Sequence, residues 1–568
     1  MISLESKQKV FEDIKKVNNL TRIFSIIKLF ISIMILAFII CLISYDKYLL
    51  YTILSVSSLI ILVLFSIFTK EAYIKLRNYK SLEYIYRRHE NRRNGNYKTF
   101  SPDGKEFIDY NDYKTLDLDI LGPKSLYQYI CVAKTYSGRK KLANQLTNPI
   151  KKDIKFTNLV NTLTNDEEAL KLEASINNID SKNSYNEDEM LSVLNKNIKI
   201  NKIGIIFMIL SYVLLIASII LLSIFNGNPA YLIFFIPLNL FISFNFTKND
   251  IFNTNPTKYS LVLNDYIKLI EDIKNINIVD DYYNEIKETL SKDLVNFKQL
   301  YKIFEMLSYR RNFIFSIIGN SLFFLNYIII FMFNKRIKKI NSIKESLNLI
   351  NELEVMLSLA IIGMDNDVYT IPSNNEYIDV KGIYHPLVKD CVPNDFKLNG
   401  GIILTGSNMA GKTTFMRTLG INLVLMNAGG VVLAKVFKAP LLNIYTSLRT
   451  VDTVQEGIST FYAEINKMKT IMEKSDNNSL VLIDEIFKGT NAKDRIYSAF
   501  EIIKKLNEKK CNFIITTHDF ELCEAKNILN YHFDEEYIEN KIYFDYKIKD
   551  GKSNKTNAIY LLKMAGVI

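Results

Sequence analysis

Tryptophan is absent from the chain, and cysteine and histidine are scarce, with five and four copies. The cysteines show no C-x-x-C spacing and the histidines lie far apart; the cysteines are Cys41, Cys131, Cys391, Cys511 and Cys523. This distribution predicts neither a disulfide framework nor a zinc site. It fits a protein of a reducing compartment such as the cytosol.

Acidic residues are outnumbered, with 60 Asp and Glu against 71 Lys and Arg, so the formal net charge is +11. A basic balance favours anionic partners, either nucleic acid or acidic lipid. The chain is also rich in Lys, Asn, Ile and Tyr, which looks like a compositional bias of the source, so charge alone is a weak argument. The 568 residues suffice for three or more domains, and the mean hydropathy of +0.05 is high for a soluble protein.

Four apolar runs occur in two closely spaced pairs. The first pair covers residues 23–43 and 49–68, and the second covers 203–225 and 231–246, with the uncharged turn 226–229 between them. Each run of the first pair has the length that a helix needs to cross a hydrocarbon core. Two long runs in tandem disfavour a cleaved signal peptide. We therefore predict two transmembrane hairpins, and the alternative for the first is a buried helical hairpin.

Basic residues are concentrated on the outer flanks of both pairs, since the first turn holds one Asp and one Lys and the second turn holds no charge. They are Lys70, Lys75, Arg77 and Lys80 after the first pair, and Lys196, Lys199, Lys202 and Lys248 around the second. The positive-inside rule therefore places both ends of each hairpin in the cytoplasm. A further basic cluster, Arg87, Arg88, Arg92 and Arg93, favours contact with anionic headgroups or nucleic acid, with a solvated helix face as the alternative.

The segment Gly-Ser-Asn-Met-Ala-Gly-Lys-Thr at residues 406–413 matches G-x-x-x-x-G-K-[ST], the P-loop pattern. An apolar strand is predicted before it at 402–405, and a helix after it from Thr414. Backbone N–H groups of such a loop face phosphate oxygens. Lys412 is expected to reach the β- and γ-phosphates, and Thr413 to hold Mg²⁺. The predicted nucleotide contacts are Gly406, Ser407, Asn408, Met409, Ala410, Gly411, Lys412, Thr413 and Thr414.

Two more apolar strands end in polar residues. Residues 479–485 end in Asp484, expected to order the Mg²⁺ shell, and Glu485, expected to orient and deprotonate the attacking water. Residues 511–519 end in a cluster that includes His518, a candidate for stabilising the γ-phosphate. Strand-end acids are often merely solvated, but a neighbouring P-loop favours the catalytic interpretation. The assignment of His518 depends on family resemblance.

The motifs together resemble those of the MutS family, a branch of the ABC-type ATPases. The resemblance rests on the P-loop, the Asp484–Glu485 pair, and the segments 384–388, 392–395, 457–461, 489–491 and 517–519, and it is strong from about residue 353 onward. Segments 121–126 and 135–142 are similar, less specifically, to the start of the family's helical core. The loop departs from the family at Ser407, usually Pro, and Ala410, usually Gly.

The resemblance implies further properties. It implies a nucleotide contact at Val392, and it identifies residues 457–461 as the signature segment, so that Ser459 acts on the nucleotide of a partner subunit in a homodimer. DNA is an implied partner of the family, but the Phe-x-Glu triplet that reads mismatches does not occur in residues 1–350. We therefore expect a branch without mismatch recognition. The chain shows no nuclease motif.

A fifth apolar run, residues 313–333, is long enough to span but contains Gly319, Asn320 and Asn326. An odd number of crossings would place the ATPase domain outside, away from ATP and Mg²⁺. Both flanks are basic, at Arg310–Arg311 and Lys335–Arg336. This run is therefore expected to be a buried core helix or one lying against the membrane.

The predicted architecture is an α/β P-loop ATPase domain of ABC type after an α-helical core and lever region with two transmembrane hairpins. The expected divisions are 1–70 with the first hairpin, 71–202 helical, 203–246 the second hairpin, 247–372 core and levers, and 373–568 the ATPase domain. The leading hypothesis is a membrane-anchored dimeric ATPase that couples Mg-ATP hydrolysis to lever movement. A tethered DNA repair or recombination factor and a transport-associated ATPase are the alternatives. Few ionisable residues in the apolar runs argue against transport.

Overall fold

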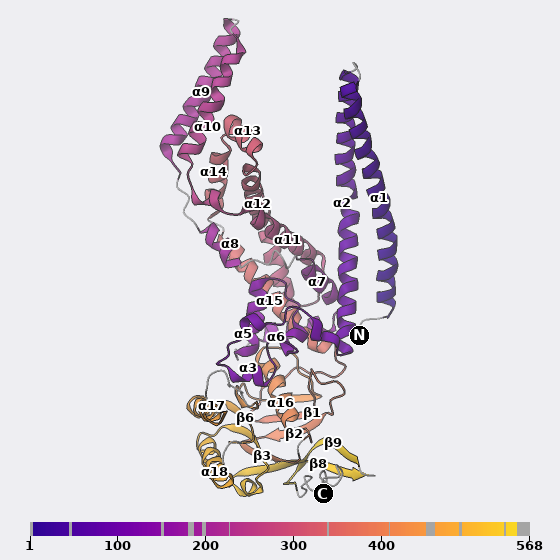
Figure 1. Cartoon of the computed structure of the whole chain (residues 1–568), viewed down its shortest axis with the longest axis vertical. Coiled ribbons are helices and arrows are strands. Elements are labelled where there is room, and N and C mark those ends of the chain that lie inside the picture. The colour runs from indigo at the N-terminus through magenta and orange to yellow at the C-terminus, as the bar shows by residue number, and fades with distance from the viewer. Residues whose placement is uncertain are drawn as a thin grey trace.

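The computed structural model describes residues 4–44, 48–148, 153–179, 187–195, 200–225, 228–337, 340–407, 409–449, 460–487, 491–538 and 541–553. The molecule is elongated (Figure 1). An α/β domain formed by the C-terminal part of the chain lies at one end, and a helical region lies in the middle. Two helical hairpins project from the helical region toward the opposite end.

The first hairpin pairs helix α1 (Leu4–Ser44) with helix α2 (Tyr48–Arg93). The two helices pack along their length, with the rings of Phe24 and Phe65 5.7 Å apart in an edge-to-face contact. The most apolar stretch of α1 has no buried residue, and that of α2 has almost none. Exposed apolar surface of this extent is the pattern of a helix that faces lipid.

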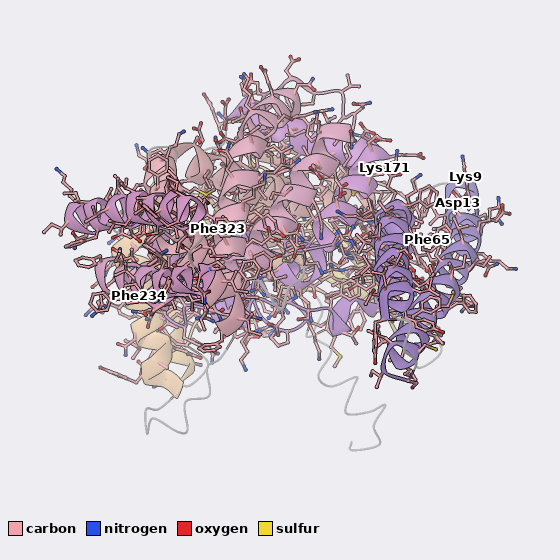
Figure 2. The ribbon with its side chains drawn as sticks, turned by 90° about the horizontal axis from the view of Figure 1, so that it is seen from above. Lys9, Asp13, Phe65, Lys171, Phe234 and Phe323 are labelled. Carbon is pink, nitrogen blue, oxygen red and sulfur yellow. The ribbon has the colours of Figure 1, made fainter. Side chains whose placement is uncertain are left out.

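The second hairpin consists of α9 (Lys202–Ile224), the 3₁₀ turn η4 (Pro229–Phe234) and α10 (Phe235–Phe246). Asn201 begins α9 by accepting hydrogen bonds from the N–H groups of Ile203 and Gly204. The returning run is α-helical only from Phe235, because its first turn is wound as a 3₁₀ helix. Figure 2, viewed from above, places Phe234 of this hairpin and Phe65 of the first on opposite sides of the molecule.

The helical region is built around α15 (Ile340–Met364), which leads directly into the α/β domain. Its other helices are α3 (Tyr113–Asp117), α4 (Leu126–Ile130), α5 (Tyr136–Thr147), α6 (Ile154–Asn165), α7 (Glu168–Asn177), α8 (Glu187–Leu194), α11 (Pro256–Asn275) and α12 (Asp281–Arg310), with short 3₁₀ turns at Asn96–Thr99, Lys105–Phe107 and Asp250–Asn253. The predicted levers correspond to the pair α11–α12 and to α15. By length and composition α15 could also span a membrane, but most of its apolar stretch is buried inside the protein.

The fifth apolar run is not one helix. It forms α13 (Phe313–Phe323) and α14 (Leu325–Ile337), which meet at an angle of 83°. Phe324 between them has a φ of 45°, in the left-handed region that ends helices. The expectation of a single helix, either buried in the core or lying against the membrane, is therefore wrong, because the chain bends by 83° in the middle of the run.

The α/β domain contains a six-stranded sheet in the order β5-β6-β7-β3-β8-β9 and a three-stranded sheet in the order β2-β1-β4. The strands are β1 (Ile378–Ile383), β2 (Asn394–Leu398), β3 (Gly401–Thr405), β4 (Val436–Lys438), β5 (Asn443–Ser447), β6 (Ser479–Asp484), β7 (Asn512–Thr516), β8 (Ile528–Ile538) and β9 (Lys541–Asp550), and the helices are α16 (Lys412–Asn427), α17 (Thr460–Lys474), α18 (Ala492–Glu508) and the turn η7 (Phe520–Glu524). In the large sheet only β8 and β9 pair antiparallel. The predicted strands at 402–405, 479–485 and 511–519 are confirmed as β3, β6 and β7.

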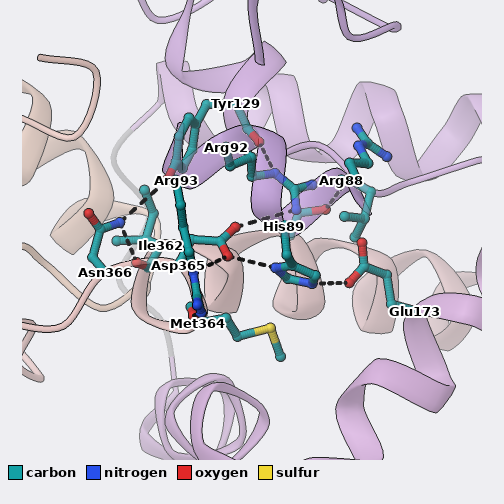
Figure 3. Close-up of polar contacts among 12 residues, drawn as sticks. Arg88, His89, Arg92, Arg93, Tyr129, Glu173, Ile362, Met364, Asp365 and Asn366 are labelled. Atoms are coloured by element: carbon teal, nitrogen blue, oxygen red, sulfur yellow. Dashed lines mark hydrogen bonds and ion pairs between the residues drawn. The ribbon is translucent and has the colours of Figure 1, made fainter. Parts of the chain in front are cut away.

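A buried ionic cluster joins the end of α2 to the end of α15 (Figure 3). His89 contacts the Asp365 carboxylate at 2.7 Å through Nδ1 and the Glu173 carboxylate at 2.9 Å through Nε2. The Nε of Arg92 donates to the carbonyl of Tyr129, and its Nη1 lies 3.4 Å from Asp365. Arg88 donates to the carbonyl of Cys131.

This burial corrects the interpretation of two of the four arginines at the end of α2, whereas Arg87 and Arg93 are exposed. Arg88 and Arg92 are almost completely enclosed, so neither an anion-binding surface nor a solvated face describes them. Burial opposes a charged imidazole, but Asp365 and Glu173 outweigh it and raise the pKa of His89 to about 9. His89 is therefore a cation at neutral pH, and the cluster is an ion network that fixes α2 against α7 and α15.

Candidate functional site

The P-loop connects β3 to α16 around two glycines with positive φ, Gly406 at 137° and Gly411 at 106°. A Cβ atom on Gly406 would lie 2.6 Å from the carbonyl oxygen of Phe533, so the loop passes β8 too closely for any side chain there. Helix α16 begins at Lys412, with its N-terminal N–H groups facing the loop. The predicted strand–loop–helix arrangement is present.

Lys412 and Ser407 hold the loop in shape. The buried ammonium group of Lys412 donates to the carbonyl oxygens of Gly406 at 2.6 Å and Ser407 at 2.8 Å. The Ser407 hydroxyl donates to the carboxylate of Glu535, which is buried on β8. Ser407, one of the two residues at which the loop departs from the family, thus forms a contact that Pro could not make.

Thr413 and Asp484 lie together at the carboxyl ends of the central strands. The Thr413 hydroxyl donates to Asp484 at 3.0 Å, and the Thr516 hydroxyl donates to the other carboxylate oxygen at 2.6 Å. Hydroxyl and carboxylate oxygens are ligands that suit Mg²⁺, which takes few protein ligands in phosphate sites. The described residues hold no group of three or more His, Cys, Asp or Glu side chains that could bind a metal on their own.

Glu485 is held by backbone contacts directly after β6. Its φ is 54°, and its N–H donates to the carbonyl oxygen of Thr516 at 3.2 Å. Its carboxylate lies 3.4 Å from Nε2 of His518, which follows β7. The neighbouring Asp519 accepts two hydrogen bonds of 2.7 Å from Arg495 of α18, which fixes the end of β7.

An open cavity of about 790 Å³ gathers most of the predicted site residues. Those that line it are Val392, Ser407, Met409, Gly411, Lys412, Thr413, Thr414, Asp484 and Glu485. His518 lies beside Glu485 in a smaller adjoining cavity of about 290 Å³. Gly406 and Ala410 shape the loop without lining the cavity, and Asn408, Ser459 and segment 489–490 lie outside the described residues.

Tyr546 and Phe533 are cavity residues that sequence reasoning missed. They come from β9 and β8, more than a hundred residues after the P-loop, and no motif marks them. Asn394 fixes the backbone around Tyr546. Its side chain donates a hydrogen bond of 3.0 Å to the carbonyl of Tyr546 and accepts one of 2.8 Å from the N–H of Ile548. The only sequence signal was Asn394 itself, which lies in the family-like segment 392–395.

His385, in the family-like segment 384–388, has a structural role. Its Nδ1 accepts a hydrogen bond of 3.1 Å from the N–H of Leu387, which requires a neutral ring. Burial, together with the nearby Arg417, lowers the pKa of His385 to about 4. The segment therefore forms a turn that places residues 388–392 over the cavity.

Two aspartates attach the helical region to the site: Asp117, the last residue of α3, and Asp119, which follows this helix. Asp117 accepts hydrogen bonds from Thr446 and from Lys467 of α17. Asp119 lies 2.7 Å from Arg449 and 3.2 Å from Arg417 of α16, the helix of the P-loop. These contacts connect α3 to the chain on both sides of residues 450–459, which lie outside the described residues.

Comparison with known proteins gives the same assignment for the C-terminal part of the chain. The family description "MutS domain V" matches residues 402–568. Proteins named DNA mismatch repair protein MutS are similar over part of the chain: that of Persephonella marina is 33% identical over 230 residues, which is 38% of this chain and 26% of the relative. The corresponding protein of Thermus thermophilus is 30% identical over 237 residues, 40% of this chain and 29% of the relative.

A third relative, from Clostridioides difficile, is 32% identical over 246 residues, again 40% of this chain and 26% of the relative. The chain thus matches less than a third of the length of each of these relatives. The similarity falls on the domain that carries the P-loop, Asp484 and Glu485. Residues 402–568 therefore match MutS domain V, and this part of the chain is similar to proteins of the MutS family.

Proposed function

We propose that the protein is a membrane-anchored ATPase that hydrolyses ATP with Mg²⁺. The observation that carries the proposal is the convergence of Lys412, Thr413, Asp484 and Glu485 on one cavity at the carboxyl ends of parallel strands. Ligands of α/β sheets bind at this edge. The match of residues 402–568 to MutS domain V supports the ATPase part of this proposal.

Each residue has a distinct role in the proposed reaction. Lys412 exchanges the carbonyl oxygens of Gly406 and Ser407 for phosphate oxygens of ATP. Thr413 and Asp484 would hold Mg²⁺, which neutralises charge on the phosphates. Glu485 accepts a proton from the attacking water, and His518, in contact with Glu485, lies where it can donate to the γ-phosphate.

The two hairpins form the proposed membrane anchor. Their apolar surfaces are exposed over the length needed to cross a bilayer, and both point toward the end of the molecule opposite the α/β domain (Figure 1). The basic flanks favour a cytoplasmic location for the N-terminus, the helical region and domain V. The α/β domain lies at the far end from both hairpins, so it would stand clear of the lipid.

The active form would be a homodimer in which ATP binding changes the position of the levers relative to the membrane. The expected partner contact, Ser459, lies outside the described residues, so this part rests on the family resemblance. Anchoring both chains in one membrane would raise their local concentration and favour pairing.

DNA binding is the second candidate function, favoured by the names of the relatives and by the net charge of +11. A salt titration of binding to homoduplex, mismatched and branched DNA separates it from the first, because phosphate contacts give a steep salt dependence. Preference for one DNA structure would support a tethered repair factor. Transport remains the least supported alternative, since the apolar runs hold few ionisable residues.

Purified protein in lipid nanodiscs is expected to hydrolyse ATP only with Mg²⁺, and Lys412→Ala is expected to lose nucleotide binding, because the phosphates lose their only buried cationic partner from the loop. Phosphate release and binding of a fluorescent ATP analogue are the measurements. Lys526→Ala, a lysine of the same domain remote from the cavity lining, is the matched control. Unchanged nucleotide binding by the Lys412 variant would contradict the assignment.

The topology can be tested by labelling single cysteines in intact cells, in a background without the five native cysteines. Asn228→Cys, in the turn of the second hairpin, is expected to react with an impermeant reagent from outside. Tyr110→Cys and Val279→Cys, on exposed parts of the helical region, are expected to react only after the cells are opened. External labelling at position 279 would overturn the cytoplasmic placement of the levers.

A further inference from the structure

Helix α13 has two opposite faces. The outward face is apolar and exposed, with Phe313 at 78%, Ile314 at 67% and Phe323 at 61% exposure, and it also carries Phe315, Ile318 and Leu322. The inward face is small and polar, and is formed by Ser316, Gly319, Asn320 and Ser321, all buried or in close contact. A soluble domain would orient such a helix the other way round.

The polar face of α13 binds the second hairpin. Asn320 accepts hydrogen bonds from the Ser243 hydroxyl of α10 at 2.5 Å and from the N–H of Asn326 at 3.0 Å. Asn326 in turn donates to Thr247 at 3.0 Å and accepts from Nε of Arg310 at 2.6 Å. Figure 2 shows Phe323 on the same side of the molecule as Phe234 of that hairpin.

At the break between α13 and α14, backbone carbonyl groups that would otherwise be unpaired in an apolar medium accept hydrogen bonds from the second hairpin. The last carbonyl groups of a helix have no partner within it. Here Asn239 of α10 donates to the carbonyl of Ser321 at 2.6 Å, and Tyr212 of α9 donates to the carbonyl of Leu322 at 2.8 Å. Irregular backbone is tolerated at membrane depth only where its polar groups are satisfied by protein in this way.

The lengths exclude a crossing. Helix α13 has 11 residues and α14 has 13, about 16 and 20 Å at 1.5 Å per residue, whereas the hydrocarbon core is about 30 Å thick. The lengths of the two helices cannot be summed into one span, because the helices meet at 83°. Basic residues flank both ends, Arg310–Arg311 before and Lys335 after, so both ends favour the cytoplasmic side.

We propose that α13 and α14 form a re-entrant element that inserts the apolar face of α13 among the acyl chains of the cytoplasmic leaflet and returns at Phe324 without crossing. This inference rests on the membrane anchor of the proposed function and adds to it a third membrane contact. Because α12 ends at Arg310, directly before α13, one end of that lever is fixed in the membrane, and the number of crossings stays even.

The absence of tryptophan permits a direct test, since each introduced Trp is the only one in the chain. Phe315→Trp and Ile318→Trp are placed in nanodiscs whose lipids carry bromine either near the headgroup end or near the methyl end of the chains. Both variants are expected to be quenched more strongly by the shallow bromine than by the deep one. Val213→Trp, in the middle of α9, is expected to show the opposite order.

Val279→Trp, which is 89% exposed and remote from the hairpins, is the matched control and is expected to show no quenching. Quenching of the α13 variants no stronger than that of Val279→Trp would overturn the re-entrant element. Deep quenching like that of Val213→Trp would overturn it in favour of a span. If the α13 variants are protected from quenching in nanodiscs that hold two chains but are quenched in nanodiscs that hold one, a second copy of the chain, and not lipid, covers the apolar face. Loss of quenching at Val213→Trp itself would instead refute the membrane anchor.

Discussion

Glu485→Gln is expected to reduce the rate of ATP hydrolysis by a factor of about 10²–10⁴, the usual contribution of a positioned general base. The amide keeps the shape of the side chain but cannot accept the proton of the attacking water. Thr413 and Asp484, the proposed Mg²⁺ ligands, are unchanged, so ATP binding should persist. Single-turnover phosphate release and equilibrium binding of Mg-ATP measure the two properties separately.

Glu508→Gln, at the exposed end of α18 in the same domain, serves as the control and should hydrolyse ATP at the normal rate. His518→Gln provides a second comparison, because His518 contacts Glu485 without lining the main cavity. Its effect should be smaller than that of Glu485→Gln. Near-normal turnover of the Glu485 variant would show that another group activates the water.

Asp365→Ala is expected to destabilise the helical region by roughly 3–5 kcal/mol, the effect of removing one partner from a buried ion pair. The substitution leaves His89 and Arg92 enclosed without the carboxylate that both contact. Glu90→Gln, on the exposed side of α2, breaks only the surface pair with Lys7 and should change stability little. Denaturant unfolding followed by far-UV circular dichroism compares the two. Equal stability of both variants would show that the cluster contributes nothing.

The same cluster predicts a pH dependence of stability. The pKa of His89 is raised to about 9 in the folded protein, above the value of about 6.5 for a free imidazole. Its stabilising contribution is therefore complete below about pH 6.5 and is lost as the pH rises through about 9. Outside this cluster, burial raises the pKa of Glu354 on α15 to about 7, so ionisation of this carboxyl group lowers the stability of the fold as the pH rises from about 4.5 to 7.

Comparison of the wild-type protein with His89→Gln isolates the imidazole. The difference in unfolding free energy between them should shrink between pH 7 and 10. A difference that is constant over this range would mean that His89 is neutral in the folded state, and that the cluster is held together by Arg92 alone.

The P-loop, its strand and its helix could be predicted because all their determinants are contiguous in sequence. The same holds for Asp484 and Glu485, which follow an uninterrupted apolar strand. Tyr546 and Phe533 could not be predicted, since only the pairing of β8 with β3 and β9 brings them to the cavity. Asn408 and Ser459 stay predictions.

The first four apolar runs were correctly predicted to be helical, but two features of the helical part of the chain were not predicted. Asn320 and Asn326 were recorded as interruptions of a span, whereas they form the hydrogen bonds that bind α13 and α14 to the second hairpin. Arg88 and Arg92 of α2 were assigned to the surface because charged residues are rarely buried. Their burial depends on Asp365 and Glu173, which are far away in the sequence and therefore gave no local signal.

Helix α2 contains neither Gly nor Pro and continues for 46 residues from the turn of the first hairpin to the cluster around His89. At 1.5 Å per residue it is a shaft of about 69 Å, of which less than half is apolar. If a rigid helix of this length tilts by about 5° about one end, its other end moves by about 6 Å. A bilayer changes the tilt of a helix when its thickness changes. Because His89 of α2 contacts Asp365, a tilt of α2 would displace Asp365, the residue that follows α15 and precedes domain V.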